Sequence, residues 1–152
     1  MDSIDRKILQ VLQADARASL QQISQAVGLS ATPCWGRIRK MEEAGVIEGY
    51  TTRLSPQAVG LGDTVLVQVT LDSHSDNTLE KFGETLAAIP EVIEAYLVSG
   101  EYDYLLRVAV KDTKDYERLL RERLYKIKGI RHSKSSFVLR TLKKADLPLF
   151  VA

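Results

Sequence analysis

The chain has 152 residues, 45% hydrophobic and 27% charged, with a formal net charge of +1 at pH 7. This composition is ordinary for a globular protein of one domain or two small ones, and it excludes a molecule that binds nucleic acid through total charge alone. No apolar run approaches the roughly 18 residues that span a bilayer, and no secretory leader is visible. We therefore expect a cytoplasmic protein with no membrane partner.

Cysteines and histidines are few, which argues against disulfides and metal sites. Cys34 is the only cysteine and cannot form an intrachain disulfide, as is typical of a reducing compartment. His74 and His132 are far apart and have no cysteine partner at metal-ligand spacing. We expect no metal, no cofactor and no catalytic cluster.

The first fifty residues are predicted to form three helices. Apolar residues recur at helical spacing over about 3–14, with Asp2 and Asp5 near the positive end of that helix. Ser19 opens a Ser-x-x-Gln capping box for a second helix, which Gly28 ends.

A third helix follows after a short turn. It covers about 31–44 and ends at Gly45, and Ser30 or Thr32 can cap it. Two helices joined by a short turn containing glycine are the helix-turn-helix pattern. The stretch Val46–Leu54 is predicted to be extended and to form a wing.

The pattern changes after residues 55–63, which are rich in Ser, Pro and Gly and are predicted to be a linker. Alternating and helical periods then predict the order strand, helix, strand, strand, helix, strand, the ferredoxin-like split βαβ arrangement. The predicted strands cover 64–71, 92–99, 103–110 and 135–142, and the predicted helices cover 79–89 and 116–127. We thus expect an α+β chain with a winged helix-turn-helix domain over 1–54 and a ferredoxin-like domain over 64–152.

The third helix is the candidate recognition helix. At 100° per residue, Cys34, Ile38 and Met41 fall on one side and pack inward. Three basic residues and no acidic one occur between positions 31 and 41, which suits a helix in the DNA major groove. The candidate DNA contacts are Ser30, Thr32, Pro33, Trp35, Gly36, Arg37, Arg39 and Lys40, with Arg53 of the expected wing.

Two alternatives remain open for this helix. A short cationic face is often only solvated surface, and helix-turn-helix geometry can serve protein contacts. Two residues favour DNA. Trp35 is expected to be partly exposed and to need a contact surface. Gly36 lies on the outer face, where glycine costs about 1 kcal/mol relative to alanine unless close approach of the backbone requires it.

The turn "SGEYD" between the second and third predicted strands is the candidate ligand site. Gly100 allows a tight backbone, and Tyr102 and Asp103 place a phenol and a carboxylate together. Asp103 can pair with a ligand ammonium group, and backbone amides near Gly100 can hold a carboxylate. On pattern alone an ordinary hairpin is the alternative.

The whole chain resembles a transcription regulator of the Lrp/AsnC, or feast/famine, family. The stretches that carry the resemblance are "DSIDRKILQVLQADARASLQQISQAVGLS", "TPCWGRIRKMEEAGVIEGYTTRLSPQAVG", "VSGEYDYLLRV" and "GIRHSKSSFVL". It implies a DNA-binding regulator that forms dimers through its sheets, and tetramers or octamers from these, with an amino-acid effector between dimers. The implied effector residues are Ser99, Gly100, Tyr102 and Asp103, with Ser133 and Ser135 of a neighbouring subunit where many members have threonine.

Other observations fit this expectation. Three basic residues on one helix make few phosphate contacts, so more than one copy is needed for tight binding. Leu66, Leu105 and Val138 are expected on a sheet face that helices leave uncovered. Two rivals are a sirohaem decarboxylase, which shares the layout but would need a catalytic cluster, and a protein that only binds partners.

Overall fold

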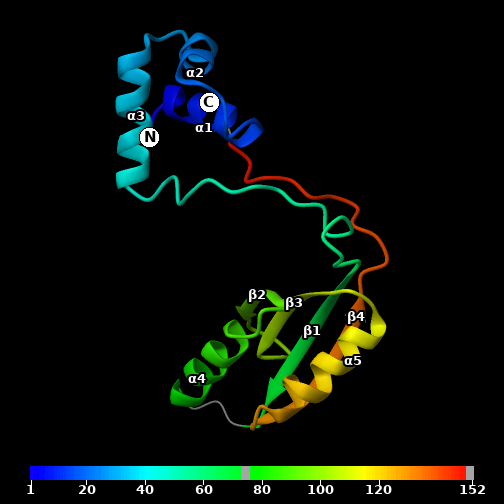
Figure 1. Cartoon of the computed structure of the whole chain (residues 1–152). Helices are drawn as coiled ribbons and strands as arrows, with labels where there is room; N and C mark the ends of the chain where they lie inside the picture. Colours follow the sequence, from blue (N-terminus) through cyan, green and yellow to red (C-terminus); the bar gives the residue numbers. More distant parts are fainter. Residues whose placement is uncertain (73–75, 150–152) are drawn as a thin grey trace. The chain divides into compact units, whose positions relative to one another are not determined.

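The chain folds into two compact units, Met1–Arg53 with Lys143–Ala152 and Leu54–Leu142 (Figure 1). The structure is a computed structural model that describes residues 1–72 and 76–149, without the side chains of 76–78. We call the first unit the head and the second the sheet unit. Each has its own hydrophobic core.

The head consists of helices α1 (Ser3–Ala14), α2 (Leu20–Val27) and α3 (Ala31–Glu43). Helix α1 starts with a reciprocal cap: the Asp5 N–H donates to Asp2 at 2.9 Å, and the Asp2 N–H donates to Asp5 at 2.9 Å. These bonds satisfy amide groups that have no partner inside the helix.

Helix α2 has the predicted caps at both ends. Ser19 and Gln22 form the capping box, and Gly28 ends the helix in the left-handed conformation with φ of +72°. The caps fix the turn before α3, so that the apolar sides of all three helices meet. The core they form contains Ile8, Leu9, Ile23, Cys34 and Met41.

The head also includes a piece from the other end of the chain, Lys143–Leu149, which we call the tail segment. Gln10 Nε2 donates to the Leu149 carbonyl at 2.9 Å, and Gln13 Nε2 donates to the Leu147 carbonyl at 3.2 Å. The Leu149 side chain packs against the head core. By its contacts the tail segment, which lies inside the expected C-terminal domain over 64–152, groups with the head.

The expected wing, Val46–Leu54, contains no assigned strand. The N–H groups of Val46 and Ile47 both donate to the Met41 carbonyl, and Ile47 packs on the head core. Tyr50 donates to Glu42 at 2.8 Å. The segment is thus attached to α3 by its first residues, and the ladder that a β wing requires is not formed within the described part of the chain.

The sheet unit has the predicted element order and the α+β fold class. A four-stranded antiparallel sheet has the strand order β2-β3-β1-β4. Its elements are β1 (Asp63–Leu71), α4 (Asp76–Ala87), β2 (Val92–Leu97), β3 (Tyr104–Val110), α5 (Thr113–Glu122), the 3₁₀ turn η1 (Leu124–Lys126) and β4 (Ile130–Phe137).

Helices α4 and α5 cover one face of this sheet (Figure 1). Alternate residues of β1 point into the core between sheet and helices, because successive side chains of a strand point to opposite faces. The core residues of β1 are Val65, Val67, Val69 and Leu71. On the opposite face, Leu66 is 37% exposed and lies opposite Arg107 of β3, with Leu105 two residues away.

The last strand was predicted over 135–142 and instead covers Ile130–Phe137. Its pairing with β1 runs from Leu71↔Ile130 to Val65↔Phe137 and ends soon afterwards, where the Val138 N–H donates to Thr64. The apolar residues that suggested a later strand, Leu139 and Leu142, are 98% and 83% exposed. Pairing with β1, rather than the hydrophobicity of its own residues, determines which residues form strand β4.

We expect Leu149→Ala to lower the free energy of unfolding of the head by about 1 kcal/mol, because it removes a partly buried side chain from a small core. Trp35 is the only tryptophan and lies in the head, so its fluorescence during urea denaturation reports this unit. Leu147→Ala is the matched control, since the Leu147 side chain is 79% exposed. Equal effects of the two substitutions would contradict docking of Leu149.

Candidate nucleic-acid interface and effector site

Helix α3 presents its two sides as predicted. Cys34 is fully buried and Met41 is 6% exposed, and Ile38 packs against the same core. The outer residues Arg39 and Lys40 are exposed. The predicted inward side of this helix is therefore confirmed. The remaining outer positions are exposed at Ser30, Thr32 and Pro33 and partly exposed at Gly36.

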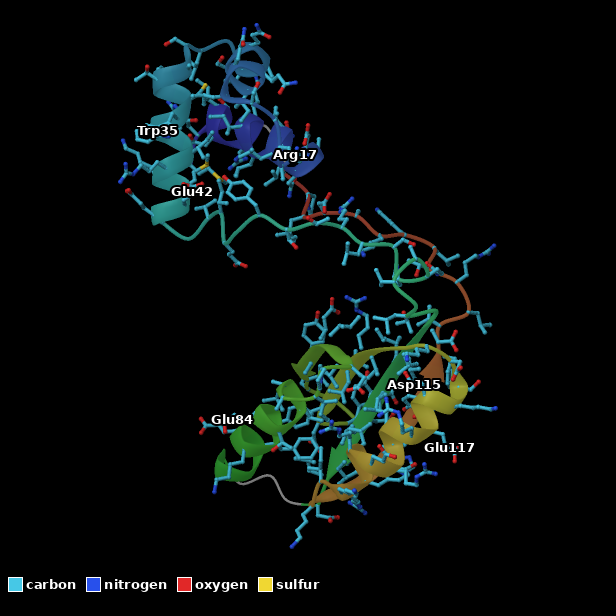
Figure 2. All side chains as sticks on the ribbon, viewed as in Figure 1. Arg17, Trp35, Glu42, Glu84, Asp115 and Glu117 are labelled. Carbon is cyan, nitrogen blue, oxygen red and sulfur yellow. The ribbon has the colours of Figure 1, made fainter. Side chains whose placement is uncertain are left out.

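Trp35 and Arg39 form the most prominent feature of the outer side. Trp35 lies midway along α3 (Figure 2) and is 53% exposed. The guanidinium carbon of Arg39 lies 5.3 Å from the centre of the Trp35 ring, and Arg39 Nε donates to Glu43 at 2.9 Å. The cation–π partner lies one turn before Arg39 and the ion-pair partner one turn after it. Together they orient a guanidinium that would otherwise rotate freely in solvent.

Arg37 has a different environment from Arg39. Its Nη1 atom donates to Asp2 at 2.6 Å and to Asp5 at 2.7 Å, so it joins α3 to the start of α1. These hydrogen bonds, the one to Asp5 first, raise the pKa of Arg37 above its ordinary value. The pKa of Asp2 is lowered, first by the Asp5 backbone N–H and then by Arg37.

The remaining DNA candidates have less specific surroundings. Ser30 is the N-cap residue of α3, but its side chain makes no capping hydrogen bond. A Cβ added at Gly36 would meet no atom within 4 Å, so packing inside the head does not require glycine there. Arg53 forms an ion pair with Asp146 of the tail segment.

The candidate effector loop connects β2 to β3. The Val98 N–H donates to the Asp103 carbonyl at 2.9 Å, and Gly100 has φ of +133°, a conformation that side chains rarely adopt. Asp103 is attached to β1 twice: its N–H donates to Val69 at 2.9 Å, and its carboxylate accepts from the Leu71 N–H at 2.7 Å. The loop therefore presents Ser99, Gly100 and Tyr102 from a fixed base.

The two effector-site serines lie on β4. Ser133 pairs with Val69, the β1 residue that also bonds the Asp103 N–H, so one β1 residue separates the loop base from Ser133. The Ser135 hydroxyl lies 2.5 Å from the Tyr116 hydroxyl of α5. Burial raises the pKa of Tyr116. Within its own chain, Ser135 is thus already hydrogen-bonded.

Sequence reasoning missed the partners of several candidates, among them Glu43 for Arg39, Tyr116 for Ser135, and the aspartates for Arg37. The spacing of Arg39 and Glu43, four residues on one helix, was a usable signal. The other two pairings join separate elements and leave no local pattern.

The described residues hold neither a metal-ligand cluster nor a membrane-spanning helix. In residues 1–72 and 76–149, no group of three or more His, Cys, Asp or Glu residues is arranged to hold a metal ion. His132 is exposed on β4, and His74 lies outside the described residues. Within the same ranges, no helix is both long and apolar enough to cross a bilayer.

Comparison with known proteins covers both units. Residues 1–48 match the winged helix-turn-helix DNA-binding family, and residues 64–148 match the Lrp/AsnC ligand binding domain. The DNA-binding transcriptional activator DecR of Escherichia coli is 37% identical over 150 residues, covering 98% of this chain and 99% of DecR. The leucine-responsive regulatory protein of Klebsiella pneumoniae is 38% identical over 146 residues, covering 96% and 89%.

Two crystal structures superpose over nearly the whole chain. An AsnC family transcriptional regulator from Agrobacterium tumefaciens has a TM-score of 0.93 and 43% identity, covering 98% of this chain and 97% of that one. A transcriptional regulator from Neisseria meningitidis in complex with L-Met has a TM-score of 0.92 and 34% identity, with the same coverage.

A helix-turn-helix head joined to a ferredoxin-like ligand-binding unit defines the class of this protein, a DNA-binding transcription regulator. Within that class, the chain belongs to the Lrp/AsnC family.

We expect Arg39→Ala to weaken binding to a specific operator by about 1–3 kcal/mol, the usual cost of removing an arginine that reads DNA. Mobility shifts at fixed salt measure the effect. Arg121→Ala on α5 is the matched control, because it removes the same charge from the sheet unit. Operator affinity that survives Arg39→Ala unchanged would contradict the assignment of this face.

We expect the stability of the head to depend on pH in the acidic range, because the Asp2 carboxylate titrates there. Because the pKa of Asp2 is lowered from 3.8 in the folded chain, its carboxylate stabilises the fold above that pH, and this contribution disappears as the pH falls through the lowered value. Asp2→Asn keeps the cap but removes the charge. Wild type should melt at a higher temperature than this variant at pH 7, and the difference should vanish as the pH falls through the lowered pKa of Asp2. A difference independent of pH, or one reproduced by Glu48→Gln, would argue against the ion pair.

Proposed function

We propose that the outer side of α3 enters the major groove of an operator, where Trp35 and Arg39 contact base edges and Lys40 contacts phosphate. The observation that carries this is the cation–π contact of Arg39 with Trp35, together with the ion pair of Arg39 with Glu43, on a helix whose other side is buried. A base-reading side chain gains specificity when its orientation is fixed before binding, because less conformational freedom is lost in the complex.

The smaller residues of α3 fit this placement. Ser30, Thr32 and Pro33 lie at its N-terminal end, where recognition helices usually approach DNA. Gly36 lies one position after Trp35 and has open space where a Cβ would be, which permits close approach of the helix backbone. We retain Arg53 as a candidate phosphate contact, which would have to leave Asp146.

The effector is, on this proposal, a free amino acid bound at the loop 99–103. The fixed carboxylate of Asp103 supplies a negative charge for the ammonium group, and amides near Gly100 suit the carboxylate. One relative is named a leucine-responsive regulatory protein, and another was crystallised in complex with L-Met. Apolar amino acids are therefore the first candidates for the effector. Ser133 and Ser135 add hydroxyl groups where they meet a neighbouring subunit.

We further propose a homodimer that joins sheet units through the face without helices, with assembly to tetramers or octamers. That face carries Leu66, Leu105 and the exposed Tyr96, around an ion pair of Glu94 with Arg107. Paired heads would raise DNA affinity through effective concentration. Such a regulator acts where the chromosome is, in the cytoplasm of a prokaryotic cell.

The test is selection of genomic DNA fragments by the purified protein, followed by mobility shifts on the enriched fragments with each of the twenty amino acids. The proposal expects enrichment of discrete sequences and a change of affinity with at least one amino acid. Recovery of random fragments, with no response to any amino acid, would overturn it.

We expect Asp103→Asn to abolish amino-acid binding while basal DNA binding survives. Asparagine keeps an oxygen that can accept from the Leu71 N–H but removes the charge that pairs with an ammonium group. Thermal shift against the twenty amino acids measures binding directly. Glu101→Gln, a neutralisation of the exposed neighbour, is the control. A normal shift in the Asp103 variant would exclude this loop as the ammonium site.

A further inference from the structure

We propose that Arg37, although it lies on the recognition helix, is a positioning residue: it fixes the orientation of α3 through Asp2 and Asp5 and does not bind DNA phosphate. This inference rests on the proposed function, in which the outer side of α3 meets DNA. It makes two acidic residues at the start of α1 determinants of operator affinity.

The geometry links α3 to a rigid point. A single nitrogen of Arg37 donates to both carboxylates, and the side chains of Arg37, Asp2 and Asp5 are 32%, 52% and 14% exposed. The same carboxylates accept the first backbone amides of α1. Arg37 is therefore bonded to groups that the helix end already holds in place, which is how a second layer of residues keeps a binding side chain in register.

Apolar packing holds the inner side of α3, and the ion pairs lie at the edge of that packing. Beside them is an open hollow of about 600 Å³, lined by Asp5, Gly36, Arg37, Lys40 and Met41 among others. Gly36 has no side chain to fill it, and the buried α3 residues Cys34 and Met41 are the ones that the helix packs inward. Ion pairs thus connect the two helices beside a region that side chains leave open.

The charges also argue against a phosphate contact. Two carboxylates surround one guanidinium, so the three groups together are negative and do not attract a phosphate. A phosphate that took the Nη1 donors of Arg37 would have to displace hydrogen bonds of 2.6 and 2.7 Å. On this inference the cationic surface of α3 is supplied by Arg39 and Lys40.

Asp5→Asn gives a test in which two explanations predict opposite signs. If the aspartate only contributes charge, its neutralisation raises the affinity for all DNA, since repulsion of phosphates decreases. If Asp5 positions α3 through Arg37, affinity for the operator falls by about tenfold while affinity for random DNA is unchanged or higher. Mobility shifts on both DNAs, with wild type measured in parallel, give the ratio.

Arg37→Gln provides a second readout, the salt dependence of operator binding. Loss of a phosphate contact reduces the slope of log affinity against log salt by about 1, whereas loss of a positioning residue leaves that slope unchanged. The double variant Asp5→Asn/Arg37→Gln should bind no more weakly than either single variant, because both substitutions break the same link. Arg37→Lys, which can bridge both carboxylates, should restore most of the operator affinity.

Each outcome decides the matter. Operator affinity that is unchanged or higher in Asp5→Asn, or a salt slope reduced by about 1 in Arg37→Gln, overturns the positioning role. If circular dichroism shows that Asp5→Asn does not fold, Asp2→Asn, which preserves the cap, replaces it. Its operator affinity is expected to fall as well, by a smaller factor. If the wild type binds no DNA sequence selectively, the result contradicts the proposed function and not the positioning role of Arg37. The effect of Arg39→Ala on operator binding distinguishes these two cases.

Discussion

The small core of the head is the constraint on which much of this molecule depends. Three short helices bury few apolar side chains, and a unit of this size gains little stability from packing alone. Its other connections are therefore polar: two capping boxes, the bonds of Arg37 to both aspartates, and the hydrogen bonds that hold the tail segment. The surface proposed to read DNA is orientated by these connections.

The sheet unit solves a different problem, since its core is large and its central strand organises the ligand region. Strand β1 pairs with β3 on one side and β4 on the other. Val69 accepts from the base of the effector loop and pairs with Ser133. The base of the loop and β4 are therefore joined through one strand of a hydrogen-bonded sheet.

Local patterns in the sequence predicted much of this structure. The capping box of α2, the left-handed Gly28, the buried side of α3 and the element order all depend on residues within a few positions of one another, and all are present. Pairing between distant residues was not predictable in this way. Strand β4 lies five residues earlier than expected because β1 selects its partners, and the Arg37–Asp5 pair spans 32 positions.

The same distinction applies to the tail segment. Its exposed leucines suggested nothing about α1, and the hydrogen bonds that hold it come from two glutamines more than 130 positions away. Side-chain amides donating to backbone carbonyls require no particular residue in the tail, so no sequence motif marks the contact.

A head assembled from both ends of the chain has a consequence for how such proteins can evolve. A unit that is one continuous stretch can be exchanged between genes in a single recombination event. Here an exchange of residues 1–53 alone would bring in a foreign α1 opposite the old Lys143–Leu149. The glutamines that hold this segment would have to arrive with the new helix, or the hybrid would lose part of its packing. New combinations of DNA specificity and ligand response are therefore expected to arise more readily by substitutions on α3 than by domain shuffling.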